Sequence, residues 1–156
     1  MACANVLIGL KMQNQLSSET QEILSNSTFV IEPGVYIYTK LSSMPCIGEH
    51  FLVAKDADEI TVVTRQENLD KLDLIERNKD DYCLIALNVS IPFYSVGFLA
   101  TVSSAFAAKG HNLLIVSTYS KDYLMVRDDL RKDAEEILTS LGLKRVTACN
   151  SSWAQD

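Results

Sequence analysis

The chain has 156 residues, of which 47% are hydrophobic and 22% are charged. This composition is typical of a folded protein, and the length suits one domain or two small ones that share a core. The formal net charge is −6 and the longest basic feature is the pair Lys144-Arg145, which argues against a nucleic-acid partner because phosphate contacts need clustered cations. No apolar stretch reaches the length of a membrane span without a charge, so we expect a soluble, cytoplasmic protein that does not enter a membrane.

Cysteines and histidines are few and scattered along the chain. They are Cys3, Cys46, Cys83, Cys149, His50 and His111. No two cysteines have the short spacing of zinc sites or redox dithiols, and neither histidine is adjacent to a cysteine. We therefore expect buried or half-buried thiols that behave as small hydrophobes, with no metal and no cofactor.

The first half of the chain is expected to hold a helix, three strands and a short second helix. Ser17 or Ser18 can cap a helix with an acidic first turn, and Pro33-Gly34 is a turn signal. Alternating β-branched and aromatic residues predict strands at residues 35–41, 51–55 and 60–64. A short helix is expected at 66–74, and the charged run 76–81 is either a linker between two halves or a solvated loop.

The second half shows clearer periodicity. Its strands are expected at residues 83–90, 113–118, 123–126 and 144–149. One helix is expected over 95–109 with Gly110 as its stop, and Asp128 can cap another helix that ends at Gly142. The 95–109 helix is apolar on two faces, so we expect both to be covered. Its main stripe is predicted to hold Val96, Leu99, Ala100, Phe106 and Ala107, and its second stripe Phe98, Val102 and Ala105.

From residue 83 onward the order is β-α-β-β-α-β, which predicts an α+β fold of the ferredoxin-like type. The first half follows a similar plan with its first helix replaced by the loop 42–48, so it is a degenerate copy. We expect two ferredoxin-like modules with antiparallel sheets and helices on one face. The expected segments are an N-terminal extension with a helix (1–27), a degenerate module (28–78), a complete module (82–149) and a tail (150–156).

Two stretches of the second half carry a resemblance to a known family. Residues 96–113, VGFLATVSSAFAAKGHNL, resemble ACT domains, in which a Gly opens the first helix and a Gly-x-Asn step leads into the second strand. Gly97, Gly110 and Asn112 stand at those places. Residues 116–126, VSTYSKDYLMV, are similar to the hairpin of one ACT subfamily.

That subfamily includes bacterial proteins with two ACT modules in tandem, and the CASTOR arginine sensors and the ACT modules of aspartokinases look like relatives. Residues 33–38, PGVYIY, resemble the start of those tandem proteins. The resemblance covers residues 28–149 and implies a tandem ACT-domain protein. It also implies a homodimer, because ACT modules commonly pair side by side.

The resemblance further implies a ligand cleft between two modules. Its expected lining is Ser95, Val96, Gly97, Phe98, Asn112, Thr118 and Asp122. A helix N-terminus offers unpaired N–H donors to a carboxylate, and Gly97 would let a ligand approach the backbone. Ser95 and Asn112 add polar groups, and Asp122 can accept from an amino group. Simpler roles stay open: Ser95 as an N-cap, Gly97 for tight packing, and Asn112 and Asp122 as turn residues.

The expected function is that of a regulatory sensor that binds a small molecule, with an amino acid as the expected ligand, and responds by rearranging modules or subunits. No converging acid–base or nucleophile set is visible, so an enzyme is not expected. An RNA-recognition module would need a basic–Gly–aromatic motif, which the strand 123–127 lacks. A protein-interaction module without a small ligand remains the alternative.

Overall fold

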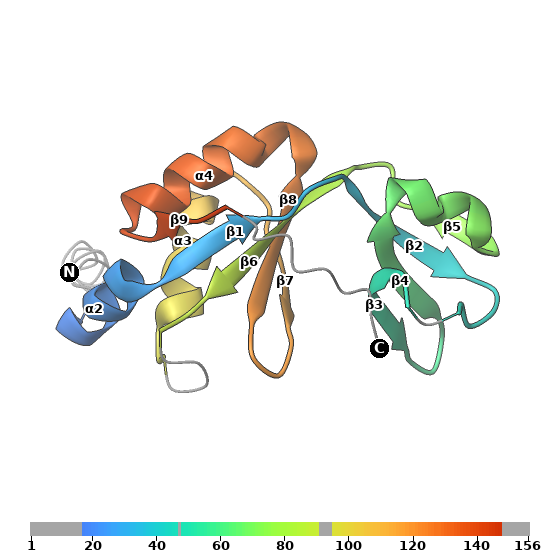
Figure 1. Cartoon of the computed structure of the whole chain (residues 1–156), viewed down its shortest axis with the longest axis horizontal. Helices are drawn as coiled ribbons and strands as arrows, with labels where there is room; N and C mark the ends of the chain where they lie inside the picture. The colour runs from blue at the N-terminus through green and yellow to red at the C-terminus, as the bar shows by residue number, and fades with distance from the viewer. Residues whose placement is uncertain (1–16, 47, 91–94, 148–156) are drawn as a thin grey trace, which may run out of the picture.

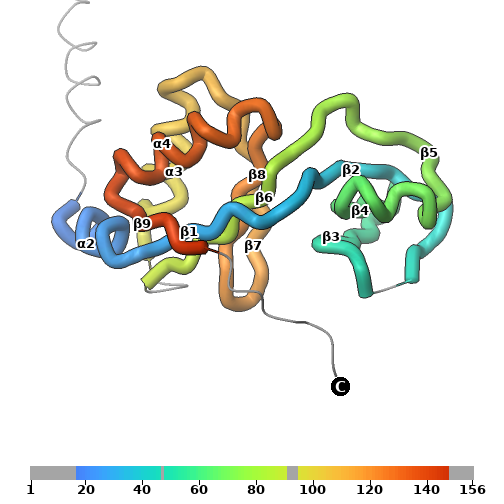
Figure 2. Tube along the Cα trace, turned by 45° about the horizontal axis from the view of Figure 1, so that its top comes forward, coloured from blue at the N-terminus to red at the C-terminus, as the bar shows by residue number. Residues whose placement is uncertain are grey.

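The computed structural model describes residues 17–46, 48–90 and 95–147, which form two lobes (Figure 1). The α/β lobe, residues 17–31 and 82–147, holds α2 (Ser18–Asn26), β1 (Thr28–Ile31), β6 (Tyr82–Asn88), α3 (Phe98–Ala108), β7 (Leu114–Ser117), β8 (Asp122–Arg127), α4 (Arg131–Ser140) and β9 (Lys144–Arg145). The β lobe, residues 36–77, holds β2 (Tyr36–Leu41), β3 (His50–Lys55), β4 (Ile60–Arg65), the 3-10 helix η1 (Gln66–Lys71) and β5 (Leu74–Arg77). The chain passes between the lobes twice, from β1 into β2 and from β5 into β6 (Figure 2).

The nine strands belong to one hydrogen-bonded sheet. Its path runs β3-β4-β2-β6-β1-β9, with β8 beside β6, β7 beside β8 and β5 beside β2. All pairs are antiparallel except β1 with β9, which is parallel. The predicted α+β class with an antiparallel sheet is therefore confirmed.

The strand β1 joins the sheet of the α/β lobe. Phe29 lies opposite Leu87 of β6 on one side and opposite Arg145 of β9 on the other, so β1 separates these two strands. The preceding helix α2, capped by Ser17 as predicted, packs into the same core. If the first module began at residue 28, its first strand, β1, would therefore belong to the sheet of the second module. The division of the chain into modules stays a prediction.

The main core fills the face of the α/β sheet that the helices cover. Its buried members are Ile23, Leu24, Phe29, Cys83, Ile85, Leu87, Phe98, Val102, Phe106, Leu124, Val126, Ala134, Ile137, Leu138 and Leu143. The residues from β6 are alternate ones, as the period of a strand requires, and α2, α3 and α4 all contribute to the same cluster. Helices on one face of the sheet are what the sequence predicted.

Both apolar faces of α3 were expected to be covered, but only the face of the second predicted stripe is buried. The helix begins at Phe98, three residues later than expected, and it buries Phe98, Val102 and Phe106. Only Phe106 belongs to the predicted main stripe, whereas Val96 is 89% exposed and Ala100 also faces solvent. When both faces of a helix are apolar, periodicity gives no preference between them, and the position of the sheet decides which one is buried.

A second apolar cluster joins the two lobes. It buries Leu84 and Met125 of the α/β lobe against Tyr36 and Val63 of the β lobe. Phe51 of β3 extends this junction by an edge-to-face contact with Tyr123 of β8 at 4.8 Å between ring centroids. Both faces of β6 are therefore buried, as its nearly continuous apolar sequence predicted.

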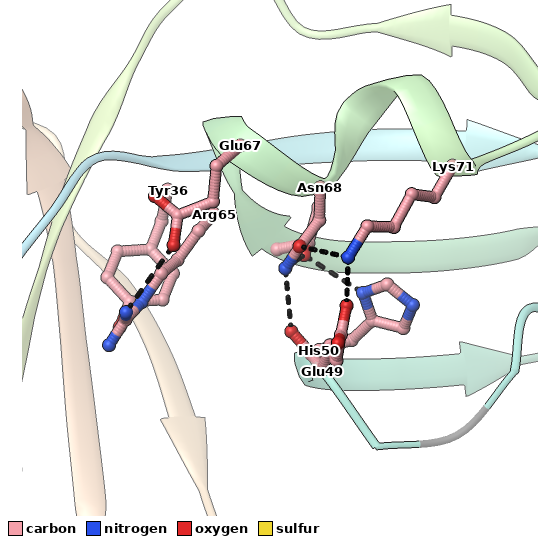
Figure 3. A network of polar contacts seen from close by, with 8 residues as sticks. Tyr36, Glu49, His50, Arg65, Glu67, Asn68 and Lys71 are labelled. Carbon is pink, nitrogen blue, oxygen red and sulfur yellow. Dashed lines mark hydrogen bonds and ion pairs between the residues drawn. The ribbon is translucent and has the colours of Figure 1, made fainter.

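The β lobe differs from expectation after β4. The residues predicted as a short helix and a linker form η1 and then β5, an exposed strand that pairs with β2. Side chains anchor η1 on the β3–β4 hairpin (Figure 3): Asn68 Nδ2 donates to Glu49 O at 3.0 Å and to Thr64 Oγ1 at 3.2 Å. His50 Nδ1 is hydrogen-bonded with the same Thr64 hydroxyl at 2.9 Å. These contacts hold η1 against the β3–β4 hairpin.

The last predicted strand, 144–149, is shorter than expected. Only Lys144–Arg145 form β9, and residues 148 and 149 lie outside the described part of the chain. None of the helices within residues 17–46, 48–90 and 95–147 has the length and apolar character needed to cross a membrane.

Candidate functional site

A groove of about 350 Å³ lies at the N-terminal end of α3. One wall is formed by the end of β6 and the start of α3, and the other by the hairpin between β7 and β8. The lining residues are Val89, Ser95, Val96, Gly97, Leu99, Ala100, Ser117, Thr118, Tyr119, Ser120, Lys121 and Asp122. All of them belong to the α/β lobe. This groove therefore sits inside one lobe, and the predicted cleft between two modules stays a prediction.

The hairpin wall is held by its own backbone. Thr118 donates to Lys121 O twice, from its N–H at 2.8 Å and from its Oγ1 at 3.0 Å, which leaves Tyr119 and Ser120 at the tip. Ser117 Oγ donates to Asp122 Oδ1 at 2.5 Å. Among the described residues no other group donates to this carboxylate, so its second oxygen can accept from a ligand.

The helix wall presents a helix end that no described side chain caps. Gly97 is the N-cap, with a φ of 83°, and its carbonyl accepts from Thr101. The N–H groups in the first turn of a helix have no intrahelical acceptor and carry a partial positive charge. Because Leu99 and Ala100 of that turn line the groove, its charge can act on an anion bound there.

Two of the simpler roles left open by the sequence are now decided. Ser95 is not the N-cap: it lies two residues before Gly97 and its carbonyl accepts from the Phe98 N–H at 3.2 Å. A Cβ on Gly97 would lie 3.7 Å from Thr20 Oγ1, an ordinary contact. Glycine is therefore required here by its left-handed backbone, and not by close packing.

Five of the seven predicted site residues line the groove: Ser95, Val96, Gly97, Thr118 and Asp122. Phe98 does not, because it is the first helical residue that faces the sheet and is only 1% exposed. Asn112 follows the opposite end of α3, which is about 16 Å long at 1.5 Å per residue. The structure thus separates Asn112 from the other six.

The prediction missed seven lining residues: Val89, Leu99, Ala100, Ser117, Tyr119, Ser120 and Lys121. A signal for part of this set was present, since Lys121 precedes Asp122 in the predicted hairpin and adds a cation there. Val89 and Ala100 carry no chemical signal. Their place in the lining follows from the way α3 lies beside β6.

Neither of the two cysteines in the described ranges, Cys46 and Cys83, lines this groove. Cys83 is fully buried in the main core, and burial raises the pKa of its thiol from 9.0 to about 11. Cys46 is exposed, contrary to prediction, on the loop after β2 in the other lobe. Within the described ranges, no three His, Cys, Asp or Glu side chains lie close enough to hold a metal ion.

Residues 78–140 match the family model of the ACT domain. This span includes β6, α3, β7, β8 and α4, and therefore every residue that lines the groove. No curated protein sequence matches the chain.

Solved structures share the fold over most of the chain. A protein of unknown function from Vibrio cholerae, described as a possible transport protein, is similar with 18% identity and a TM-score of 0.68, covering 78% of this chain and 94% of the other. A protein from Agrobacterium tumefaciens is 20% identical with a TM-score of 0.62, covering 80% and 95%. The regulatory subunit of aspartate kinase from Thermus thermophilus is 6% identical with a TM-score of 0.51, covering 72% and 95%. With its β-α-β-β-α order of elements, the matched span, residues 78–140, is an ACT domain.

Proposed function

We propose that this protein is a regulatory sensor, without catalytic activity of its own, that binds an amino acid in the groove at the start of α3. The observation that carries the proposal is the meeting of an uncapped helix end with the charged hairpin residues Lys121 and Asp122. The ACT domain supports a regulatory role that depends on a small molecule. The similar Thermus thermophilus protein is itself a regulatory subunit.

The two charges of an amino-acid backbone have complementary partners in the groove. The α-carboxylate would lie at the positive end of α3, where Lys121 adds a full positive charge from the opposite wall. The α-amino group would donate to the free oxygen of Asp122. A volume of about 350 Å³ is at the small end of the range for ligand sites, which suits an amino acid better than a nucleotide.

Regulation would follow from the position of the groove at the surface. Val96 and Tyr119, one on each wall, are both 89% exposed, and a second copy of the chain would bury them. A ligand that bridges the hairpin and α3 would favour the arrangement in which the two walls are held together. If a homodimer contacts these walls, ligand binding and association are then coupled by the same free energy.

Thermal-shift screening and calorimetry against the twenty amino acids and a set of nucleotides test the proposal. A ligand at 100 times its Kd stabilises the folded state by about 2.7 kcal/mol, which would raise the melting temperature of a chain of this size by about 5 to 10 °C. Asp122→Asn keeps an oxygen for Ser117 but removes the negative charge, so it should weaken binding of the amino acid.

Asp58→Asn is the matched control, because Asp58 lies on an exposed turn in the β lobe and the same change there should leave binding intact. Absence of any response across the panel, with the protein folded, would refute the proposal.

A second function, contact with a protein without any small ligand, is favoured by the exposure of Val96 and Tyr119. Light scattering with and without amino acid separates the two functions. A dimer that is indifferent to every amino acid would support the protein contact alone. A monomer under all conditions would exclude the homodimer.

A further inference from the structure

We infer that the groove selects amino acids with an uncharged side chain. This inference rests on the proposed function and narrows it to one class of ligand. It follows from a count of the charges that the two walls provide.

The helix wall has no charge. Between Asp81 and Lys109 the sequence contains no Asp, Glu, Lys, Arg or His. This stretch includes the whole of β6 and the whole of α3. Every side chain on this wall is therefore neutral.

The hairpin wall has one charge of each sign. Lys121 and Asp122 are its charged lining residues in the described part of the chain. Lys121 has no ion-pair partner among residues 17–46, 48–90 and 95–147, and Asp122 has only the neutral Ser117 as a donor there. Both charges are thus available to a ligand, and the two backbone charges of an amino acid would use both.

A third charge, on the side chain of the ligand, would find no partner among the described lining residues. It would face Val89, Leu99 and Ala100, and it would lose part of its hydration without a counter-charge. Apolar side chains gain from the same surface. Neutral polar side chains can be satisfied by the hydroxyls of Ser95 and Ser120.

Calorimetry with pairs of equal shape measures this selectivity in the native protein. Asparagine against aspartate, and glutamine against glutamate, differ in charge while the side chain keeps its size; methionine against lysine tests the opposite sign. We expect each neutral member to bind at least about tenfold more tightly. If the charged members bind as tightly as the neutral ones, the inference is overturned and the proposed function stands. If no amino acid binds, the proposed function fails and the inference fails with it.

A substitution on the helix wall tests the cause. Ala100 is exposed and lines the groove, so Ala100→Lys adds a cation that can pair with an acidic side chain. We expect the ratio of the glutamate Kd to the glutamine Kd to fall by about tenfold or more. Ala108→Lys is the control, since Ala108 is also exposed on α3 but lies about 12 Å further along it.

The ratio should be unchanged in Ala108→Lys. An unchanged ratio in a folded Ala100→Lys variant would overturn the inference. Should that variant fail to fold, the comparison of neutral and charged ligands in the native protein decides the matter alone.

Discussion

Replacement of Gly97 by alanine tests the turn that places the end of α3 at the groove. Gly97 has a φ of 83°, and an added Cβ would meet nothing closer than Thr20 Oγ1 at 3.7 Å. The cost is therefore one of backbone conformation and not of collision. A left-handed conformation costs a residue with a Cβ about 1–2 kcal/mol, and the loss of freedom in the unfolded chain offsets about 0.4–1 kcal/mol of this. We expect a net loss of about 1 kcal/mol in the free energy of unfolding.

Gly110 offers a matched comparison at the other end of the same helix. It has a φ of 73°, and an added Cβ there would meet open space, so Gly110→Ala should lose the same amount of stability. Urea denaturation measures the free energy of unfolding of both variants. In thermal denaturation, each melting temperature should fall by about 2–4 °C. Amino-acid binding should weaken only in Gly97→Ala, because only this residue lines the groove. A neutral or stabilising Gly97→Ala would refute the reasoning, since it would mean that the backbone strain is absent.

Three further predictions concern stability. Phe106→Ala should lower the free energy of unfolding in urea by about 3–5 kcal/mol because Phe106 is fully buried, whereas Ile75→Ala, at a site 60% exposed, should change it by less than about 0.5 kcal/mol. The pKa of Cys83 is about 11 in the folded chain against an ordinary 9.0, so the folded state favours the neutral thiol. The stability that this preference contributes is complete below pH 9. It is lost between pH 9 and pH 11, at about 1.4 kcal/mol per pH unit. Denaturation between about pH 8 and about pH 11 should therefore show a shallower decline for Cys83→Ala than for the native chain. Asn68→Ala removes the donor to Glu49 O and Thr64 Oγ1 and should cost about 1–3 kcal/mol, with faster hydrogen exchange in η1, while Gln66→Ala should have little effect.

The candidate site was predictable in part, and the reason lies in the range of the interactions involved. The hairpin around Thr118 and Asp122 and the turn at Gly97 are local features, so their residue types point to them directly. Phe98 lies outside this groove because it is the first residue of α3 and is buried in the core, whereas the helix was predicted to begin three residues earlier. The length of α3 separates Asn112 from Gly97, so Asn112 does not line this groove, and its role in binding stays a prediction.

The sequence alone determined the order of elements in the second half, the hairpins and the ACT resemblance, because strand alternation, helix caps and turn residues act over a few neighbours. It did not predict β1 at all, and it left open which apolar face of α3 would be buried and which side chains would meet across the groove. Those choices depend on contacts between segments distant in the chain, such as β1 with β6 and β9. A four-residue strand carries too little pattern to specify its partner, and only the packed tertiary structure provides the neighbouring strands that complete its hydrogen bonds.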